Sequence, residues 1–257
     1  MKRLACFIIS VSVSAACLTA QSADDIITLS RNRVSANSVS TQSRMVVLNK
    51  DKTTAERIIN QYSQDDSRGN ERTLIEFVRP NAVKGTRFLT VENAGGADNR
   101  WIFLPALGKV RRIASSEGES SFMGTDFSFD DISSMNREVG ADVHALLKEE
   151  DLNGKACFVV ESKPKDKTYQ YSKIISWIDK GSSINYKMEL YDKKDKLAKV
   201  YEASDFQNVQ GRLTAKQTKM STLGDGTSTT IHVDKIRYDD KIPEGVFTPN
   251  YLETGKY

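Results

Sequence analysis

Few side chains in this sequence could carry out chemistry, and they are scattered. The sequence contains two histidines, His144 and His232, and neither has a metal-ligand spacing or a second histidine nearby. It also contains no GxSxG nucleophile elbow and no GxxxxGK[ST] phosphate loop. We therefore expect both histidines to be exposed or bonded within the structure, and we expect no metal and no cofactor.

Paired carboxylates occur at Asp130-Asp131 and at Asp239-Asp240. General acid–base catalysis needs two such groups to face one substrate, but adjacent side chains on a strand point to opposite faces. We interpret these pairs as markers of strand ends or turns. We expect Asp126 and Asp130 to anchor their loop through hydrogen bonds to backbone amides. The sequence favours a protein that is not an enzyme, although an enzyme acting on envelope lipid or polymer stays as an alternative.

The N-terminus predicts export. A basic start at Lys2-Arg3, an apolar run and then Ser14-Ala15-Ala16-Cys17 are typical of a secretory signal peptide, residues 1–16. In one interpretation Cys17 becomes the lipidated first residue of a membrane-anchored protein. In the other, an ordinary signal peptidase cuts after Ala20 or Ala23. We expect a protein of the bacterial cell envelope that faces the periplasm, on either the inner or the outer membrane.

The cysteine count is consistent with an exported protein without an internal disulfide. Cys6 leaves with the signal peptide and Cys17 is lipidated or lost, so Cys157 keeps no partner. A catalytic thiol needs a nearby cation or histidine that lowers its pKa. The neighbours in KACFVVES provide none, so we predict a buried, unreactive thiol.

The charge balance argues against nucleic acid as a partner. The chain carries 37 Lys and Arg against 34 Asp and Glu, and without Lys2 and Arg3 the balance is 35 against 34. Binding to phosphates requires a clustered basic face. Lys109, Arg111 and Arg112 are the basic residues of interest, since they could approach lipid head groups or form the polar outer face of a strand.

Residues 101–132 form the most informative stretch, because they combine many large apolar side chains with glycines at Gly108, Gly118 and Gly124. Such a segment can line an apolar surface that holds a ligand, with the glycines permitting turns or bends. The alternative is that these side chains are ordinary core. The residues predicted to contact such an apolar ligand are Trp101, Phe103, Leu104, Phe122, Met123, Phe127 and Phe129.

The elements that position this stretch are predicted to be mostly strands. Residues 184–190 alternate strictly between apolar and polar side chains, and further strands are expected at 168–179, 199–202 and 229–238. Turn signals such as Asn153-Gly154 suggest consecutive antiparallel hairpins. Helices are expected at 24–33, from the spacing of Ile26 and Leu29, and at 141–149.

The fold class predicted is therefore mainly β with some α. It is a strongly curved antiparallel sheet or half-open barrel, with a few helices covering the opening. The sequence shows no internal repeat and no low-complexity linker. We therefore expect one domain over residues 17–257, in which 17–37 form a tether and the first helix.

Several motifs resemble the LolA-like family of bacterial outer-membrane lipoprotein-sorting proteins. They are PxxxKG at 80–85, WIFLPALGKVRRI at 101–113 and SFMGTDFSFDDI at 121–132, with NGKACFVVESKPK from Asn153 and VFTPNYLE from Val246. The resemblance covers most of the chain after residue 70, and the residues before it match poorly. For that reason no interior arginine is assigned, although Arg44 is a candidate.

The resemblance implies a half-open β-barrel whose hollow holds the acyl chains of a lipid or lipoprotein in transit. The soluble sorting proteins of this family have no lipid anchor, so Cys17 would place this chain nearer to an anchored acceptor or to a divergent relative that serves a different lipid. A membrane transporter or acceptor protein is then a possible partner. The alternative function is a periplasmic adaptor or structural partner of a membrane exporter without carrier activity.

Overall fold

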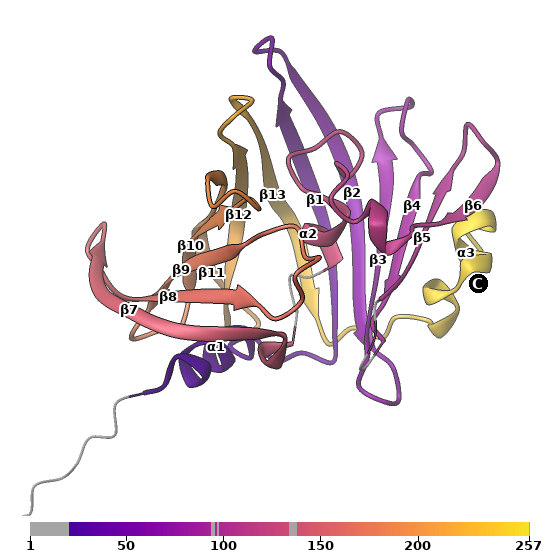
Figure 1. Ribbon diagram of the computed structural model, residues 1–257. Helices are drawn as coiled ribbons and strands as arrows, with labels where there is room; N and C mark the ends of the chain where they lie inside the picture. Colours follow the sequence, from indigo (N-terminus) through magenta and orange to yellow (C-terminus); the bar gives the residue numbers. More distant parts are fainter. Residues whose placement is uncertain (1–20, 94–95, 97, 134–137, 257) are drawn as a thin grey trace, which may run out of the picture.

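The computed structural model describes residues 21–93, 96, 98–133 and 138–256 (Figure 1). The predicted signal peptide at 1–16 and Cys17 lie outside the described residues, so they stay predictions. Among the helices that are described, none has the length and apolar character needed to cross a membrane.

Thirteen strands of the described residues form one antiparallel sheet that curves strongly but does not close (Figure 1). Their order is β6-β5-β4-β3-β2-β1-β13-β12-β11-β10-β9-β8-β7, with β6 and β7 at the two free edges. The predicted curved, half-open antiparallel sheet is thus confirmed.

The strands of the first half are β1 (Ser38–Leu48), β2 (Thr54–Asp65), β3 (Glu71–Arg79), β4 (Arg87–Val91), β5 (Asn99–Leu104) and β6 (Lys109–Arg112). Those of the second half are β7 (Asp142–Leu152), β8 (Lys155–Pro164), β9 (Lys173–Asp179), β10 (Asn185–Tyr191), β11 (Leu197–Val209), β12 (Arg212–Thr222) and β13 (Thr227–Tyr238). Neighbouring strands are consecutive hairpins, except that β1 also pairs with β13 and so joins the two halves.

The helices are short: α1 (Ala23–Arg31), α2 (Phe129–Ser133) and α3 (Pro249–Thr254), with 3-10 turns η1 (Ser115–Glu117), η3 (Val139–Ala141) and η4 (Glu244–Phe247). Helix α1 confirms the helix predicted at 24–33, and it begins where Ser22 and Asp25 form a reciprocal capping box. It packs Ile26 and Ile27 against Val160 and Ile178 of β8 and β9.

The helix predicted at 141–149 is wrong, because residues 142–149 belong to edge strand β7 and Ala141 ends the 3-10 turn η3. The turn after β7 explains the difference: Asn153 and Gly154 both have positive φ, at 54° and 81°, as a two-residue hairpin requires. This hairpin pairs β7 with β8 from Asp142 to Leu152, and the pairing outweighs the local helical spacing. The apolar stripe that suggested a helix is exposed, with Val143 at 59%.

The other strand predictions are confirmed, with shifted ends. The stretches 184–190 and 229–238 lie within or next to β10 and β13, and 199–202 is part of the longer β11. The strand expected at 168–179 begins only at Lys173.

The two faces of the first half-sheet are covered by different segments. Residues 113–133, here called the crossing segment, run from β6 towards β7 and pack Phe122 and Phe129 against Ile75, Phe88 and Ile102. We call this side the inner face. On the outer face, η4 and α3 pack against Leu74 and Leu89 of β3 and β4. Since neighbouring residues of a strand point to opposite faces, each strand contributes to both layers.

Candidate functional site

The inner face borders a cavity of about 880 Å³ that the crossing segment does not fill. Its apolar lining comes from β1, β2, β3, β13 and the crossing segment: Val39, Met45, Ile59, Ile75, Phe127, Ile132, Ile231 and Val233. Small polar side chains lie between them, among them Thr41, Ser43, Ser63, Thr73 and Thr218. The arrangement can hold a slender apolar group and offers it few strong hydrogen-bond partners.

Buried polar contacts fix the crossing segment to β13. The carboxylate of Asp126 accepts hydrogen bonds from the hydroxyls of Thr227 and Thr229, at 2.5 and 2.7 Å. The Asp126 backbone N–H donates to the Thr229 hydroxyl at 2.9 Å, and Arg57 of β2 donates to the Met123 carbonyl at 2.6 Å. Asp126 therefore anchors the loop, as predicted, but through threonine hydroxyls rather than backbone amides.

The next anchor is Asp131 on α2, whose carboxylate is almost fully buried. It accepts hydrogen bonds from Lys199 Nζ at 2.8 Å, from the Tyr171 hydroxyl at 2.9 Å and from the Ser128 backbone N–H at 2.8 Å. Burial, and then the nearby Asp131 charge, raise the pKa of Tyr171 well above its usual value. Tyr171 therefore stays a hydrogen-bond donor at any physiological pH.

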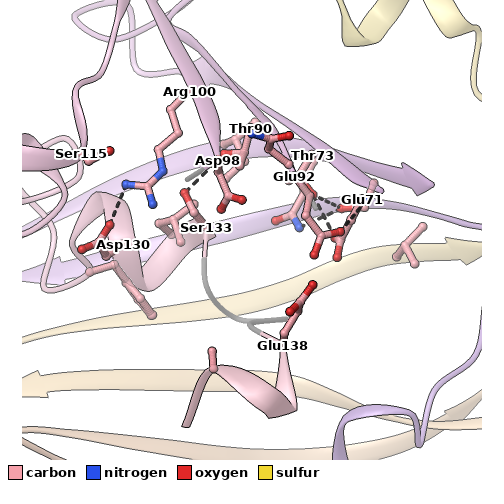
Figure 2. A pocket seen from close by; sticks show the side chains of 18 of the residues that line it. Glu71, Thr73, Thr90, Glu92, Asp98, Arg100, Ser115, Asp130, Ser133 and Glu138 are labelled. Atoms are coloured by element: carbon pink, nitrogen blue, oxygen red, sulfur yellow. Dashed lines mark hydrogen bonds and ion pairs between the residues drawn. The ribbon is translucent and has the colours of Figure 1, made fainter. Parts of the chain in front are cut away.

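Charged side chains gather at one end of the cavity (Figure 2). Four of them, Glu71, Glu92, Asp98 and Glu138, are here called the acidic mouth. Glu92 accepts a hydrogen bond from the Glu71 backbone N–H at 2.9 Å, which ties the ends of β3 and β4 together. Burial raises the pKa of Asp98, against the opposing effect of nearby Arg100.

Arg100 lies beside the acidic mouth and donates to Asp130 at 2.6 Å, with both side chains largely buried. Asp130 and Asp131 thus diverge from α2 towards different partners, and they do not form a catalytic pair. Arg100 is not among the site residues predicted from the sequence. Strand alternation could have found it, because Arg100 and Ile102 share the face opposite to Trp101 and Phe103.

The predicted lipid-binding residues occupy three different places. Phe127 lines the cavity. Phe122 and Phe129 belong to the inner-face core, where Leu104 and Met123 pack against them. Trp101 and Phe103 lie on the outer face, where they pack with the η4–α3 segment. The structure therefore divides the set between the cavity wall, the inner-face core and the outer face, and does not gather it into one site.

The remaining candidates have structural partners. His144 makes contacts with the Ser162 hydroxyl at 2.8 Å and the Val139 carbonyl at 3.0 Å. Cys157 is fully buried, as predicted, and burial raises the pKa of its thiol. Arg44 is 40% exposed and pairs with Glu56, away from the cavity lining. Within the described ranges, no group of three His, Cys, Asp or Glu residues is placed to hold a metal ion.

The basic residues after WIFLP lie at the β6 edge. Arg111 donates to Glu117 at 2.5 Å and Arg112 donates to Asn99 at 2.7 Å. Neither they nor Lys109 line the cavity. Their contact with lipid head groups stays a prediction.

Comparison with known proteins places these features in a family. A family model described as "Uncharacterized protein" matches residues 69–254. None of the curated proteins matches this chain.

Three solved structures show the same fold over 90% of this chain. A DUF1329 family protein from Desulfovibrio piger is 29% identical, with 97% of its own chain covered and a TM-score of 0.85. A Vibrio parahaemolyticus domain, provisionally described as an outer membrane lipoprotein-sorting protein domain, is 29% identical, with 98% covered and a TM-score of 0.84. A LolA superfamily protein from Nitrosomonas europaea is 18% identical, with 100% covered and a TM-score of 0.71.

Proposed function

Because this chain belongs to the LolA-like family, we propose that it binds acyl chains of a lipid or lipoprotein in the inner-face cavity. It then carries or accepts them in the cell envelope. The observation that carries this proposal is the cavity itself. Its volume of about 880 Å³ falls within the range of roughly 300–1,000 Å³ typical of small-molecule sites.

Binding rests on burial of methylene groups against the aliphatic wall. Each buried CH₂ contributes about 0.8 kcal/mol, so a few of them give useful affinity. The Ser and Thr side chains interspersed in the lining reduce its apolar area, which keeps the affinity low enough for release. No catalytic step is proposed.

Among the predicted contact residues, we propose Phe127 as part of the acyl-binding wall, because it lines the cavity. Phe122, Phe129, Leu104 and Met123 support that wall from the core. We also keep the proposal that Cys17 is lipidated. Two or more acyl chains there would anchor the protein stably, and a membrane transporter or acceptor protein would then exchange the cargo.

A cavity-filling substitution tests the proposal. Thr41 on β1 lines the cavity, whereas its neighbour Ser40 does not and points to the other face. In the full-length protein, Thr41→Trp should weaken binding of a fluorescent fatty-acyl probe by about tenfold or more, since it takes the space of several methylene groups. The matched control Ser40→Trp should bind as the wild type does.

Native mass spectrometry of the protein purified from membranes gives a second readout. The proposal expects co-purified lipid with the wild type and with Ser40→Trp, and less with Thr41→Trp. A wild-type protein that carries no lipid and refuses the acyl probe, while its thermal unfolding is cooperative, would contradict the carrier function and favour the adaptor alternative.

A further inference from the structure

We propose that the cavity selects amphiphiles whose head group is cationic or uncharged and excludes those that end in a carboxylate or a phosphate. This inference rests on the proposed function and names the head-group class of its ligand. It follows from the charges that surround the entrance to an otherwise apolar cavity.

The lining is strongly acidic at one end. Among the described lining residues, six are acidic and two are basic: Glu71, Glu92, Asp98, Asp130, Glu138 and Asp166 against Arg100 and Lys165. Figure 2 shows Glu71, Glu92 and Asp98 on the sheet side, with Glu138 facing them across the opening. An apolar tail inside the cavity would therefore leave its head group among carboxylates.

Both cations of this lining already have partners within the protein. Arg100 donates to Asp130 at 2.6 Å, and Lys165 Nζ donates to the Gly140 carbonyl at 2.7 Å. An anionic head group would have to compete with these contacts before it could pair with either cation. It would also meet the like charges of the acidic mouth at close range, where repulsion opposes binding.

Partial burial makes these charges effective. Glu71 and Glu92 are half-buried, so solvent screens them less than it would screen fully exposed carboxylates. An ammonium head group at this position gains attraction from several carboxylates at once. An uncharged hydroxyl head group loses nothing there, because carboxylates accept hydrogen bonds.

The arrangement suits an organic cation better than a metal ion. Divalent cations need several carboxylate oxygens within about 2.0–2.6 Å of one point. The acidic mouth is spread around the rim, and no three such residues in the described part of the chain could hold a metal ion. A bulky ammonium group has no such geometric requirement.

Three single-chain amphiphiles of equal length test the inference: dodecylammonium, monododecanoylglycerol and dodecanoate. Each would displace a fluorescent acyl probe from the full-length protein at neutral pH and low salt. We expect the ammonium and glycerol compounds to bind at least about tenfold more tightly than dodecanoate. The gap between ammonium and carboxylate should shrink as salt is added, because the charges are then screened.

A charge-neutralised variant provides the critical comparison. Combining Glu71→Gln, Glu92→Gln and Glu138→Gln should bring the three affinities to within about threefold of one another. The control combines Glu119→Gln, Glu202→Gln and Glu253→Gln, which remove the same charge from exposed positions outside the cavity and should keep the wild-type order.

The outcomes separate the two proposals. If dodecanoate binds as tightly as dodecylammonium to the wild type, the head-group inference is overturned and the carrier function stands. The head-group inference is also overturned if the two triple variants show the same relative affinities for the three amphiphiles. If none of the three compounds binds a folded protein, the proposed function itself fails.

Discussion

The carboxylate of Asp131 on α2 lies 2.8 Å from the ammonium nitrogen of Lys199 on β11, with both side chains largely buried. This ion pair joins the crossing segment to the second half of the sheet. Two further contacts fix the crossing segment to other strands: Asp126 accepts a hydrogen bond from Thr229 of β13, and Asp130 pairs with Arg100 of β5. The wall of the cavity formed by Phe127 and Ile132 is therefore held in place by polar contacts.

We first predict an asymmetry between the two partners of this pair. Asp131→Asn leaves Lys199 buried without its counter-charge and should lower the free energy of unfolding by about 3–5 kcal/mol. Lys199→Met should cost less, about 1–3 kcal/mol, because Asp131 keeps its hydrogen bonds from Tyr171 and Ser128. Urea unfolding followed by tryptophan fluorescence measures both. A larger loss for Lys199→Met would show that these donors do not compensate.

The second prediction concerns the space next to Asp130. A Cβ atom at Gly118 would overlap the Asp130 carboxylate, although the backbone there has ordinary helical angles. Gly118→Ala should therefore displace Asp130 from Arg100 and destabilise the protein by about 1–3 kcal/mol. Gly140 has open space around its Cβ position and serves as the control. Equal thermal unfolding midpoints of Gly118→Ala and Gly140→Ala would refute this reading.

The third prediction tests the anchor on β13. Thr229→Val keeps the shape of a fully buried side chain, but it removes the hydroxyl that donates to the Asp126 carboxylate and accepts from the Asp126 backbone N–H. The buried Asp126 carboxylate then lacks one hydrogen-bond donor, which should lower the free energy of unfolding by about 1–3 kcal/mol. The neighbouring Thr230→Val, on the opposite face of the same strand, should change stability little. Hydrogen exchange of the crossing segment should increase only in Thr229→Val.

A fourth prediction concerns alkaline pH. Burial raises the pKa of Tyr201 to about 12 and raises that of Tyr171 further. An unfolded tyrosine loses its proton near pH 10, so above that pH the unfolded state binds fewer protons than the folded state. The free energy of unfolding should therefore fall from about pH 10 upwards.

Tyr201→Phe tests the contribution of this one group. The variant cannot ionise at this position, so its free energy of unfolding should fall less steeply between pH 10 and pH 12 than that of the wild type. Urea titrations at a series of pH values give the two slopes. Identical slopes would mean that Tyr201 ionises as readily in the folded protein as in the unfolded chain.

The fifth prediction separates the two faces of β5. Trp101 packs with the η4–α3 segment on the outer face, away from the cavity. Trp101→Ala should lower stability by about 3–5 kcal/mol if the site cannot collapse. At temperatures where the Trp101→Ala variant is folded, its affinity for an acyl probe should equal that of the wild type. A loss of affinity without a loss of stability would instead make Trp101 a ligand contact.

The elements that the sequence predicts correctly are those whose signals are local. The capping box of α1 and the strict alternation of β10 depend on residues close together in the chain, and both were predictable. At 141–149 two local signals conflict: the apolar residues have helical spacing, and the hairpin turn Asn153-Gly154 follows a few residues later. The hairpin prevails because β7 pairs with β8 over its whole length.

By itself, the sequence determined the class of fold, the family and the absence of an evident catalytic motif. Periodicity, turn residues and short motifs depend only on residues that are close together in the chain. Only the tertiary structure decided which side of the sheet each residue of 101–132 faces. It also brought Glu71, Glu92, Asp98 and Glu138 to one opening. The physical reason is that strand alternation defines two faces without saying which one is hollow. Which face is hollow depends on how far the crossing segment fills the inner face. The position of this segment is set by contacts to strands that are distant from it in the sequence.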